Sequence, residues 1–215
     1  MKKVYFVTGI DTNVGKSIAT GYLANQMMQE GKKVITQKLI QTGNVEVSED
    51  IEMHRKLMGL PLLDVDKNRH TCPYIFTYPC SPHLAARIDR KEISIAKINE
   101  CTNSLLSKYD VVLLEGAGGI MVPIQDDYLT IDFIKDEKLP IILVTSPKLG
   151  SLNHTLLTIE SCLNRGIVID TIVYNDFPKG DEVISPDTYA FIQKYMDRHK
   201  MDTKLIKIPN IEIPS

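Results

Sequence analysis

Short apolar runs and amphipathic stretches alternate along most of the chain. The apolar runs are "KVYFVTG", "KVITQKLI", "DVVLLEGAGG", "PIILVTS" and "VIDTIVYN". Runs this short and rich in β-branched residues are typical of strands buried on both faces of a parallel sheet. The amphipathic stretches predict helices over residues 15–32, 48–59, 94–109 and 151–166. This alternation predicts an α/β fold with a doubly wound, mainly parallel sheet flanked by helices.

Two of these helices carry further signals. In the first, Ile18, Tyr22 and Leu23 fall on one stripe, which predicts its buried face, and the helix is expected to end at Gly31. The second begins with a Ser-Glu-Asp cluster and is expected to end at Gly59. Both helices therefore have predicted boundaries.

The stretch from residue 61 to 91 shows neither pattern and carries four prolines, at positions 61, 73, 79 and 82. A stretch of this length without a clear helix or strand is more often functional than a mere connection. No repeat, low-complexity segment or linker divides the 215 residues. We therefore expect a single domain over residues 1–215.

Composition narrows the classes of function. The net charge is −2 and the pI is near 6.2, which disfavours a general nucleic-acid binder with a basic face. The four cysteines form no C-x-x-C pair and are expected to be free thiols in a reducing compartment. The apolar run at the start is too short for a signal peptide, and no run is long enough to span a membrane. These features predict a soluble cytoplasmic protein without nucleic-acid or membrane partners.

The stretch "GIDTNVGKS", residues 9–17, almost matches the phosphate-binding pattern G-x-x-x-x-G-K-[ST], but its first glycine stands one residue too early. A predicted strand precedes it and a predicted helix follows, so backbone amides and the helix dipole favour an anion there. Gly15 allows close approach, Lys16 supplies positive charge to the β- and γ-phosphates, and Ser17 offers a hydroxyl to Mg²⁺. The alternative is a capped strand–turn–helix with a surface lysine; the context favours the phosphate loop.

Two acidic residues are candidate partners of the Mg²⁺ ion. Glu115 follows four apolar residues of a predicted buried strand, and a buried carboxylate needs a cation or hydrogen bonds. Mg²⁺ takes oxygen ligands and few protein groups, which suits Glu115. Asp50, taken alone, is better explained as an acid in the first turn of a helix that begins near Ser48.

At this point the sequence resembles the dethiobiotin synthetases. "GIDTNVGKS" is similar to the family's G-T-D-T-x-V-G-K-T, which also spaces its first glycine one residue too far. Further matches, in chain order, are "SPH" at 81–83, "EGAGG" at 115–119, "LPIILV" at 139–144 and "LGSLNH" at 149–154. The resemblance is collinear from about residue 2 to 175. The sequence departs from the family at Lys38-Leu39, where Lys-Pro is frequent, and at Ser17, where Thr is commoner.

The resemblance implies an ATP-dependent enzyme of biotin biosynthesis with Mg²⁺ as cofactor. Its reaction converts 7,8-diaminopelargonate, CO₂ and ATP to dethiobiotin, ADP and phosphate. An amine adds to CO₂, the carbamate attacks the γ-phosphorus, and the second amine closes the ring on the resulting mixed anhydride. The family is homodimeric, with its active site at the subunit interface. Such chemistry requires positioning and the neutralisation of crowded anions.

The resemblance also implies roles for individual residues. Lys16, Lys38 and Thr12 would be catalytic, and the metal ligands would be Ser17, Asp50 and Glu115. The diamine or its carbamate would contact Thr12, Thr42, Ser81 and Gly118, and, from the second subunit, Gly150, Ser151 and Asn153. The nucleotide would contact Asp11, Thr12, Asn13, Val14, Gly15, Lys16, Ser17, Ile18, Glu115, Gly118 and Asn175. Longer members of the family continue beyond "IPNIEIPS" into a segment that helps hold the nucleotide base. Asn175 is therefore the single base contact expected here, and selection for a purine is expected to be looser than in those members.

Simpler structural roles stay open for some of these residues. The free amides from Gly150 to Asn153, at the start of a predicted helix, suit a substrate carboxylate, but Ser151 could equally be only a helix N-cap. Thr42 could be a turn residue before Gly43. His83 and His154 match family motifs but receive no catalytic role, because most single histidines are structural.

Other functions compete with this one. A partitioning-type ATPase switch carries an additional lysine early in its loop, which "IDTN" lacks. Cobyrinate diamide synthase has a similar loop but needs a glutamine-hydrolysing domain that this length does not accommodate. A small-molecule kinase would transfer phosphate without needing CO₂, so bicarbonate dependence separates it from the synthetase.

Overall fold

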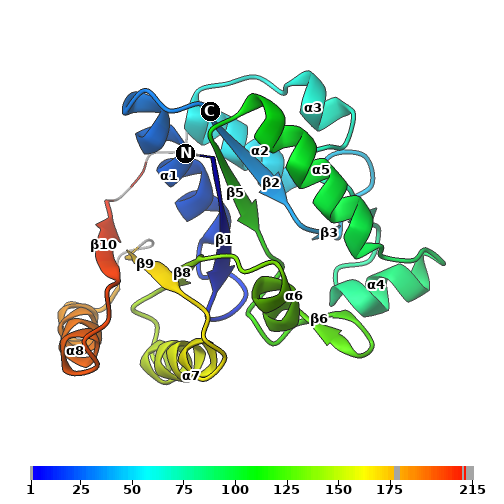
Figure 1. The fold of residues 1–215 in the computed structure, drawn as a ribbon. Coiled ribbons are helices and arrows are strands. Elements are labelled where there is room, and N and C mark those ends of the chain that lie inside the picture. The colour runs from blue at the N-terminus through cyan, green and yellow to red at the C-terminus, as the bar shows by residue number, and fades with distance from the viewer. Residues whose placement is uncertain (1, 177–179, 210, 212–215) are drawn as a thin grey trace.

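A six-stranded parallel sheet forms the centre of the molecule (Figure 1). We describe it from a computed structural model, which describes residues 2–176, 180–209 and 211. The strand order is β10-β9-β8-β1-β5-β2. Their bounds are β1 (Lys3–Gly9), β2 (Val34–Lys38), β5 (Val111–Glu115), β8 (Ile141–Thr145), β9 (Ile169–Asn175) and β10 (Lys204–Ile208). The predicted doubly wound parallel sheet is thus confirmed.

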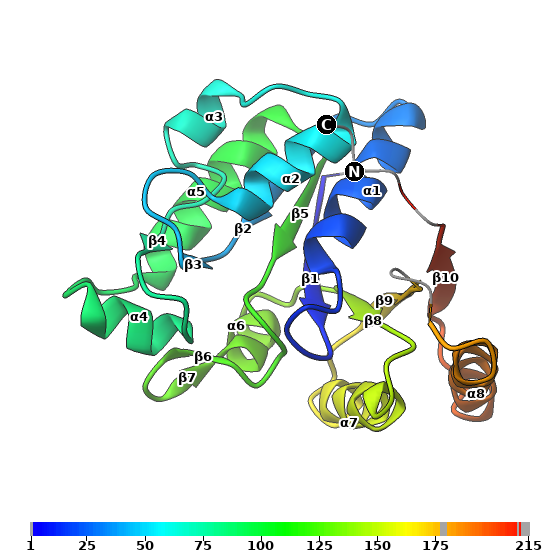
Figure 2. The ribbon, with the colours of Figure 1, turned by 180° about the vertical axis from the view of Figure 1, so that it is seen from behind.

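Helices cover both faces of the sheet (Figures 1 and 2). One face carries α5 (Ile95–Lys108), α6 (Thr130–Asp136), α7 (Ser151–Leu163) and α8 (Ile184–Arg198). The other carries α1 (Lys16–Gln29) and α2 (Glu49–Met58). Successive strand residues serve opposite layers: Phe6 packs in the first core and Val7 in the second, and neither is exposed. This alternation is why the strands read as continuous apolar runs.

Smaller elements surround the sheet. The pair β3 (Gln41–Thr42) and β4 (Ile75–Phe76) is parallel, whereas β6 (Pro123–Gln125) and β7 (Tyr128–Leu129) form an antiparallel pair. Two short helices, α3 (Asp64–Lys67) and α4 (Pro82–Ile88), lie at the edge next to β2 and β3. The sequence-based expectation had no counterpart for α3, α4, α6, α8, β10 or these two strand pairs.

The stretch over residues 61–91 is more ordered than expected. It contains α3, β4 and α4, so the expectation of an irregular segment was wrong. Side chains fasten it: Asp89 accepts hydrogen bonds from the backbone and hydroxyl of Thr77 (3.0 and 2.6 Å), and the Tyr74 hydroxyl accepts one from Ser94 N (2.8 Å). These elements are too short for a periodic signal, and tertiary contacts hold them instead.

The buried face of α1 also differs from the expected one. Ile18 and Tyr22 are only half-buried, whereas Ala19, Thr20, Gly21, Leu23 and Ala24 are buried. The prediction is thus confirmed for Leu23 and only in part for Ile18 and Tyr22, and small side chains let α1 lie close to the sheet and to α2. Among the described residues, no helix is both long and apolar enough to cross a membrane.

Parallel pairing gathers the carboxyl ends of the strands at one edge. β1 lies between β5 and β8, and β5 pairs with β2, so the loops after these four strands are neighbours. The register sets Lys38, the last residue of β2, opposite Glu115, the last of β5. In open parallel sheets this edge is where ligands bind.

Candidate active site

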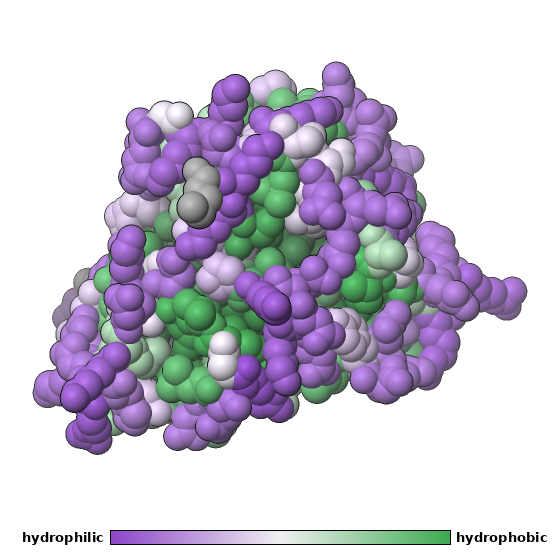
Figure 3. All heavy atoms as spheres, in the orientation of Figure 1, coloured by the Kyte–Doolittle hydropathy of each residue, from purple (hydrophilic) through white to green (hydrophobic). Residues whose placement is uncertain are grey.

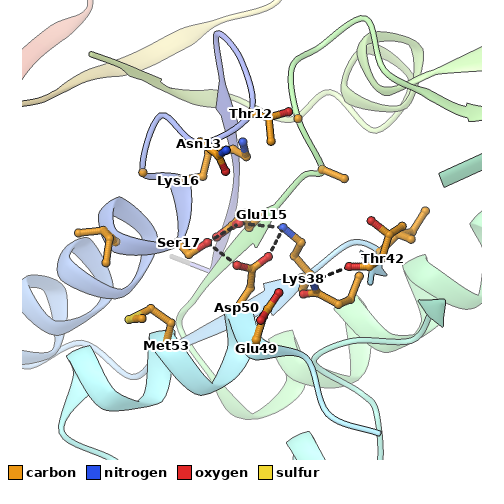
Figure 4. Close-up of a pocket in the computed structure, with 16 residues that line it drawn as sticks. Thr12, Asn13, Lys16, Ser17, Lys38, Thr42, Glu49, Asp50, Met53 and Glu115 are labelled. Atoms are coloured by element: carbon orange, nitrogen blue, oxygen red, sulfur yellow. Dashed lines mark hydrogen bonds and ion pairs between the residues drawn. The ribbon is translucent and has the colours of Figure 1, made fainter. Parts of the chain in front are cut away.

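A cavity of about 580 Å³ opens at the carboxyl edge of the sheet (Figure 4). The loop after β1, the end of β2, the first turn of α2 and the segment after β5 surround it. Eleven of the predicted site residues line it: Thr12, Asn13, Gly15, Lys16, Ser17, Ile18, Lys38, Thr42, Asp50, Glu115 and Gly118. Residues far apart in the chain therefore line one cavity.

The loop between β1 and α1 adopts a backbone conformation that requires glycine at position 15. Gly15 caps α1 with φ 85°, and a Cβ there would come 2.0 Å from Asn175 Nδ2. Asn175, at the end of β9, donates from Nδ2 to the Val14 carbonyl at 3.0 Å. Asp11 Oδ1 accepts from Thr12 N at 2.7 Å. The loop is thus fastened from below by Asn175, whose predicted contact with a base stays a prediction.

Lys16 is buried beneath this loop, with 8% of its surface exposed. Its Nζ donates to the Asp11 carbonyl at 3.1 Å. Burial lowers the pKa of Lys16, the charge of Lys38 lowers it further, and Glu115 and Asp50 oppose both effects. A positive charge held with so little compensation is well placed to attract an anion.

Lys38 bridges the two carboxylates (Figure 4). Its Nζ lies 2.6 Å from Asp50 Oδ2 and 2.8 Å from Glu115 Oε1, and it also donates to the Gly116 carbonyl at 3.1 Å. Burial alone would lower the pKa of Lys38, but Glu115 and Asp50 outweigh it and raise the pKa above its ordinary value. The ammonium group therefore stays charged.

Ser17 brings a third oxygen to the same place. Its hydroxyl lies 2.5 Å from Asp50 Oδ1 and 3.2 Å from Glu115 Oε1. Asp50 stands in the first turn of α2, and Ser48 caps that helix by accepting from Ile51 N at 3.2 Å. Asp50 is thus both a first-turn acid and part of the cluster. We call Lys16, Ser17, Lys38, Asp50 and Glu115 the phosphate-loop cluster.

Sequence reasoning missed two residues on the far side of Glu115. Thr20 Oγ1 lies 2.9 Å from Glu115 Oε2, and His54 Nε2 lies 2.7 Å from the same oxygen. Both side chains are fully buried. The available signal was spacing: His54 follows Asp50 by four residues, which sets the two on one face of a helix.

Other predicted residues lie around the rim or away from the cavity. Ser81 precedes α4 and is not among the lining residues, and Val14 and Asn175 are buried under the loop. Gly150, Ser151 and Asn153 belong to the β8–α7 segment, residues 146–153, and do not line the cavity either. One chain thus brings together the phosphate-loop residues but not the whole predicted substrate set.

Ser151 is not the N-cap of α7. Gly150 holds that position with φ 93° and offers no side chain, while the Ser151 hydroxyl donates toward the Ser146 and Lys148 carbonyls of the preceding loop. The Ser151 amide was expected to be free, but it donates to Lys148 O at 2.9 Å. The first-turn amides of Leu152 and Asn153 receive no side-chain cap, which leaves this helix end able to accept an anion.

Neither of the two motif histidines lines the cavity. His83 lies in the first turn of α4, and His154 is exposed on α7. Their exclusion from the catalytic set stays a prediction.

Comparison with known proteins agrees with this geometry. A family model described as an AAA domain matches residues 3–212. The ATP-dependent dethiobiotin synthetase BioD 2 of Pasteurella multocida is 48% identical over 94% of this chain and 95% of its own length. The protein of the same name from Haemophilus influenzae is 51% identical over 84% of this chain and 95% of its own.

A solved structure supports the fold alone. The signal recognition particle receptor FtsY from Elizabethkingia anophelis superposes with a TM-score of 0.59 at 15% identity, covering 99% of this chain and 60% of FtsY. This chain therefore spans less than two thirds of FtsY, and the likeness concerns the arrangement of helices and strands. Sequence identity near one half over nearly whole chains is far more specific, and it confirms the predicted resemblance: the chain belongs to the family of ATP-dependent dethiobiotin synthetases.

Proposed function

We propose that this enzyme, an ATP-dependent cyclo-ligase by its family, makes dethiobiotin in the penultimate step of biotin biosynthesis. The substrates are 7,8-diaminopelargonate, CO₂ and ATP, and the other products are ADP and phosphate. The observation that carries the proposal is the phosphate-loop cluster, in which two buried lysines, a hydroxyl and two carboxylates meet at one cavity. One domain over residues 1–215 would carry this chemistry.

Lys16 and Lys38 act on the anions of the reaction. In our proposal an amine of the diamine adds to CO₂, the carbamate oxygen attacks the γ-phosphorus, and the second amine attacks the carbonyl and releases phosphate. Each stage gathers negative charge near the γ-phosphate. The burial of both lysines supports their role, because a charge screened little by water acts strongly on a developing anion. Both work as electrostatic clamps, with Thr12 at the rim donating a hydrogen bond to the same anion.

Ser17, Asp50 and Glu115 would hold Mg²⁺. The Ser17 hydroxyl lies within hydrogen-bonding distance of one oxygen of each carboxylate, and such hard donors fit this ion. When bound, Mg²⁺ neutralises phosphate oxygens and orients the nucleotide. Lys38 contacts the same two carboxylates and supplies the neighbouring positive charge from the protein itself.

The phosphate loop would hold the nucleotide. Its backbone amides at the start of α1 suit the phosphates, and the contacts we propose come from residues 11–18 together with Glu115 and Gly118. Asn175 lies directly beneath Gly15, which supports a role at the base-proximal end of the loop. Base selectivity would rest on that side chain.

The diamine would lie between two subunits. Thr42 and Gly118 line the cavity of one chain, and Ser81 stands at the start of α4 nearby. Gly150, Ser151 and Asn153 of a second copy would receive its carboxylate at the uncapped end of α7. Exposed leucines support a homodimer: Leu149 is 83% exposed. Apolar atoms also gather over α7 in Figure 3, where Leu157 and Leu163 are exposed.

The absence of disulfides among the four cysteines supports a cytoplasmic location for the proposed reaction. Cys72, Cys80, Cys101 and Cys162 are all free. Free cysteines are usual in reducing compartments. No contact with nucleic acid or membrane is part of the proposal.

Phosphate release tests the function directly. Purified protein would be given ATP and Mg²⁺ with and without 7,8-diaminopelargonate and bicarbonate, while phosphate and dethiobiotin are measured. We expect release that requires both additions, with dethiobiotin formed in step. Release indifferent to both would overturn the proposal in favour of a nucleotide switch. Release that needs the diamine but not bicarbonate would indicate a kinase.

A further inference from the structure

The two oxygens of the Glu115 carboxylate have separate sets of partners. Oε1 faces the cavity, 2.8 Å from Lys38 Nζ and 3.2 Å from Ser17 Oγ. Oε2 points away from it, 2.9 Å from Thr20 Oγ1 and 2.7 Å from His54 Nε2. Thr20 and His54 do not line the cavity, whereas Lys38 and Ser17 do, so the partners of Oε2 lie behind the carboxylate. Oε1 alone is directed to the place where ligands meet.

His54 lies behind the cluster. It is fully buried on α2, one turn after Asp50. An ionised carboxylate accepts only, so Nε2 of the histidine donates. Its other nitrogen, Nδ1, has no hydrogen-bond partner within the part of the chain that the structure describes. Burying a polar ring with half of its capacity unused costs free energy, so the contact with Glu115 is the interaction that this ring serves.

The protonation of Glu115 agrees with this contact. Burial alone would raise the pKa of Glu115, but Lys38 and His54 outweigh it and hold the pKa far below its ordinary value. The carboxylate is therefore ionised and ready to accept from both sides.

The packing of α1 against α2 brings His54 within reach. Gly21 stands at the crossing, where a Cβ would come 2.8 Å from the Leu57 side chain and 3.2 Å from His54 Cα. Glycine inside a helix is unfavourable unless packing requires it. Here its absent side chain allows α2 to approach until His54 meets the carboxylate at the end of β5.

We propose that His54, assisted by Thr20, is a positioning residue that fixes Glu115 as a one-oxygen ligand of Mg²⁺. Held through Oε2, the carboxylate presents Oε1 beside the Ser17 hydroxyl and Asp50. Neither residue touches the nucleotide; each acts through Glu115. The inference rests on the proposed role of Glu115 as a metal ligand.

Binding of a fluorescent ADP analogue, titrated with Mg²⁺, tests this role without turnover. His54→Leu removes the donor at similar volume, and His54→Gln restores an N–H near the position of Nε2. We expect His54→Leu to raise the Mg²⁺ concentration for half-maximal binding about 10-fold, the usual cost of losing a partner of a metal ligand. His54→Gln should recover most of that loss, and binding in EDTA should be unchanged in both.

Thr20→Val provides a second route, because it removes the other donor to Oε2 and tests the proposal even where His54→Leu fails to fold. We expect a smaller shift in the same direction. An unchanged Mg²⁺ dependence in His54→Leu, or equal weakening in EDTA, overturns the proposal; so does a His54→Gln variant as impaired as His54→Leu. Glu115→Gln separates the two levels: if it leaves the Mg²⁺ dependence unchanged, the assignment of Glu115 as a ligand fails as well.

Discussion

The phosphate-loop cluster and the β8–α7 segment lie at the same edge of the sheet but are built in different ways. In the cluster, side chains from α1, β2, α2 and β5 bind one another, and Glu115 and Lys38 are almost completely buried. In the β8–α7 segment, the Ser151 hydroxyl donates to carbonyls of its own loop, and Lys148, Leu149 and Gly150 are exposed. The cluster is completed within one chain, whereas we propose that a second copy completes the segment.

This difference assigns distinct tasks to the two regions. A site that neutralises phosphates gains from groups held rigidly in a dry environment, because they need not reorganise during the reaction. In our proposal the site that admits the diamine is completed by a second subunit, and such a surface can open and close. The comparison predicts that substitutions in the cluster affect chemistry and stability, whereas those in the segment affect assembly and substrate affinity.

The largest effect is expected at Lys16. Lys16→Ala removes the positive charge that we assign to the transferring phosphoryl group, and turnover should fall about 1,000-fold. Steady-state dethiobiotin formation measures it, with Lys194→Ala on the exposed surface of α8 as the matched control. Activity close to that of the wild type would remove Lys16 from the mechanism.

The next effect concerns the support of α2, which carries Asp50 and His54. Arg55 and Asp66 form a buried pair, with 2.8 Å between Nη2 and Oδ1 and 2.9 Å between Nε and Oδ2, and Thr71 also donates to Asp66. Asp66→Asn leaves Arg55 buried without its counter-charge, so the free energy of unfolding should fall by about 3 kcal/mol. Urea denaturation measures it. Asp64→Asn is the control, because the Asp64 side chain is 94% exposed and should matter little.

The same pair predicts a dependence on pH. Burial alone would raise the pKa of Asp66, but hydrogen bonds from Arg55 and Thr71 outweigh it and lower the pKa below 3.8. A carboxyl whose pKa is lowered by folding stabilises fully above its unfolded value and loses that stabilisation as the pH falls through its folded value. The difference between wild type and Asp66→Asn should stay constant from about pH 5 to 7 and shrink below about pH 4. A difference independent of pH would contradict this account.

Much of the cluster was predictable from local pattern. A strand, a glycine-containing loop and a helix predict an anion site, and an acid that ends an apolar strand predicts a buried charge with a partner. Parallel pairing then brings Lys38 and Glu115 together, since both end neighbouring strands. Asp50 and Lys38 both needed the family resemblance, because a place in a first turn suffices to explain the acid and no local pattern singled out the lysine.

His54, Thr20 and Gly21 could not be predicted in the same way. Each acts through the crossing of α1 and α2, which depends on small side chains rather than on a stripe of large ones. Periodicity pointed to the large residues Ile18, Tyr22 and Leu23, of which Leu23 alone is buried, and gave no sign of the crossing. Nor does the sequence of one chain indicate what covers Leu149, because the partner surface belongs to another copy in our proposal.

A smaller effect is expected at the β8–α7 segment. Leu149→Asp sets a charge on a side chain that we propose to be covered in the homodimer, so the dissociation constant of the dimer should rise about 10-fold or more. Sedimentation velocity over a range of concentrations measures it. Turnover should fall at low protein concentration and recover at high concentration. Val183→Asp is the control, because Val183 is also highly exposed, at 77%. An equal rise of the dissociation constant in that variant would contradict a specific interface at Leu149.

The smallest effect is expected at Ser151. Its hydroxyl holds the loop before α7 through the Ser146 and Lys148 carbonyls, and a hydrogen bond of this kind contributes about 1 kcal/mol. Ser151→Ala should therefore raise KM for 7,8-diaminopelargonate about 5-fold, while KM for ATP and kcat stay near wild type. Ser107→Ala removes a similar local bond, to the Ser104 carbonyl at the end of α5, and serves as control. A change in KM for ATP would mean that the segment is coupled to the phosphate-loop cluster, and the separation of tasks between the two regions would fail.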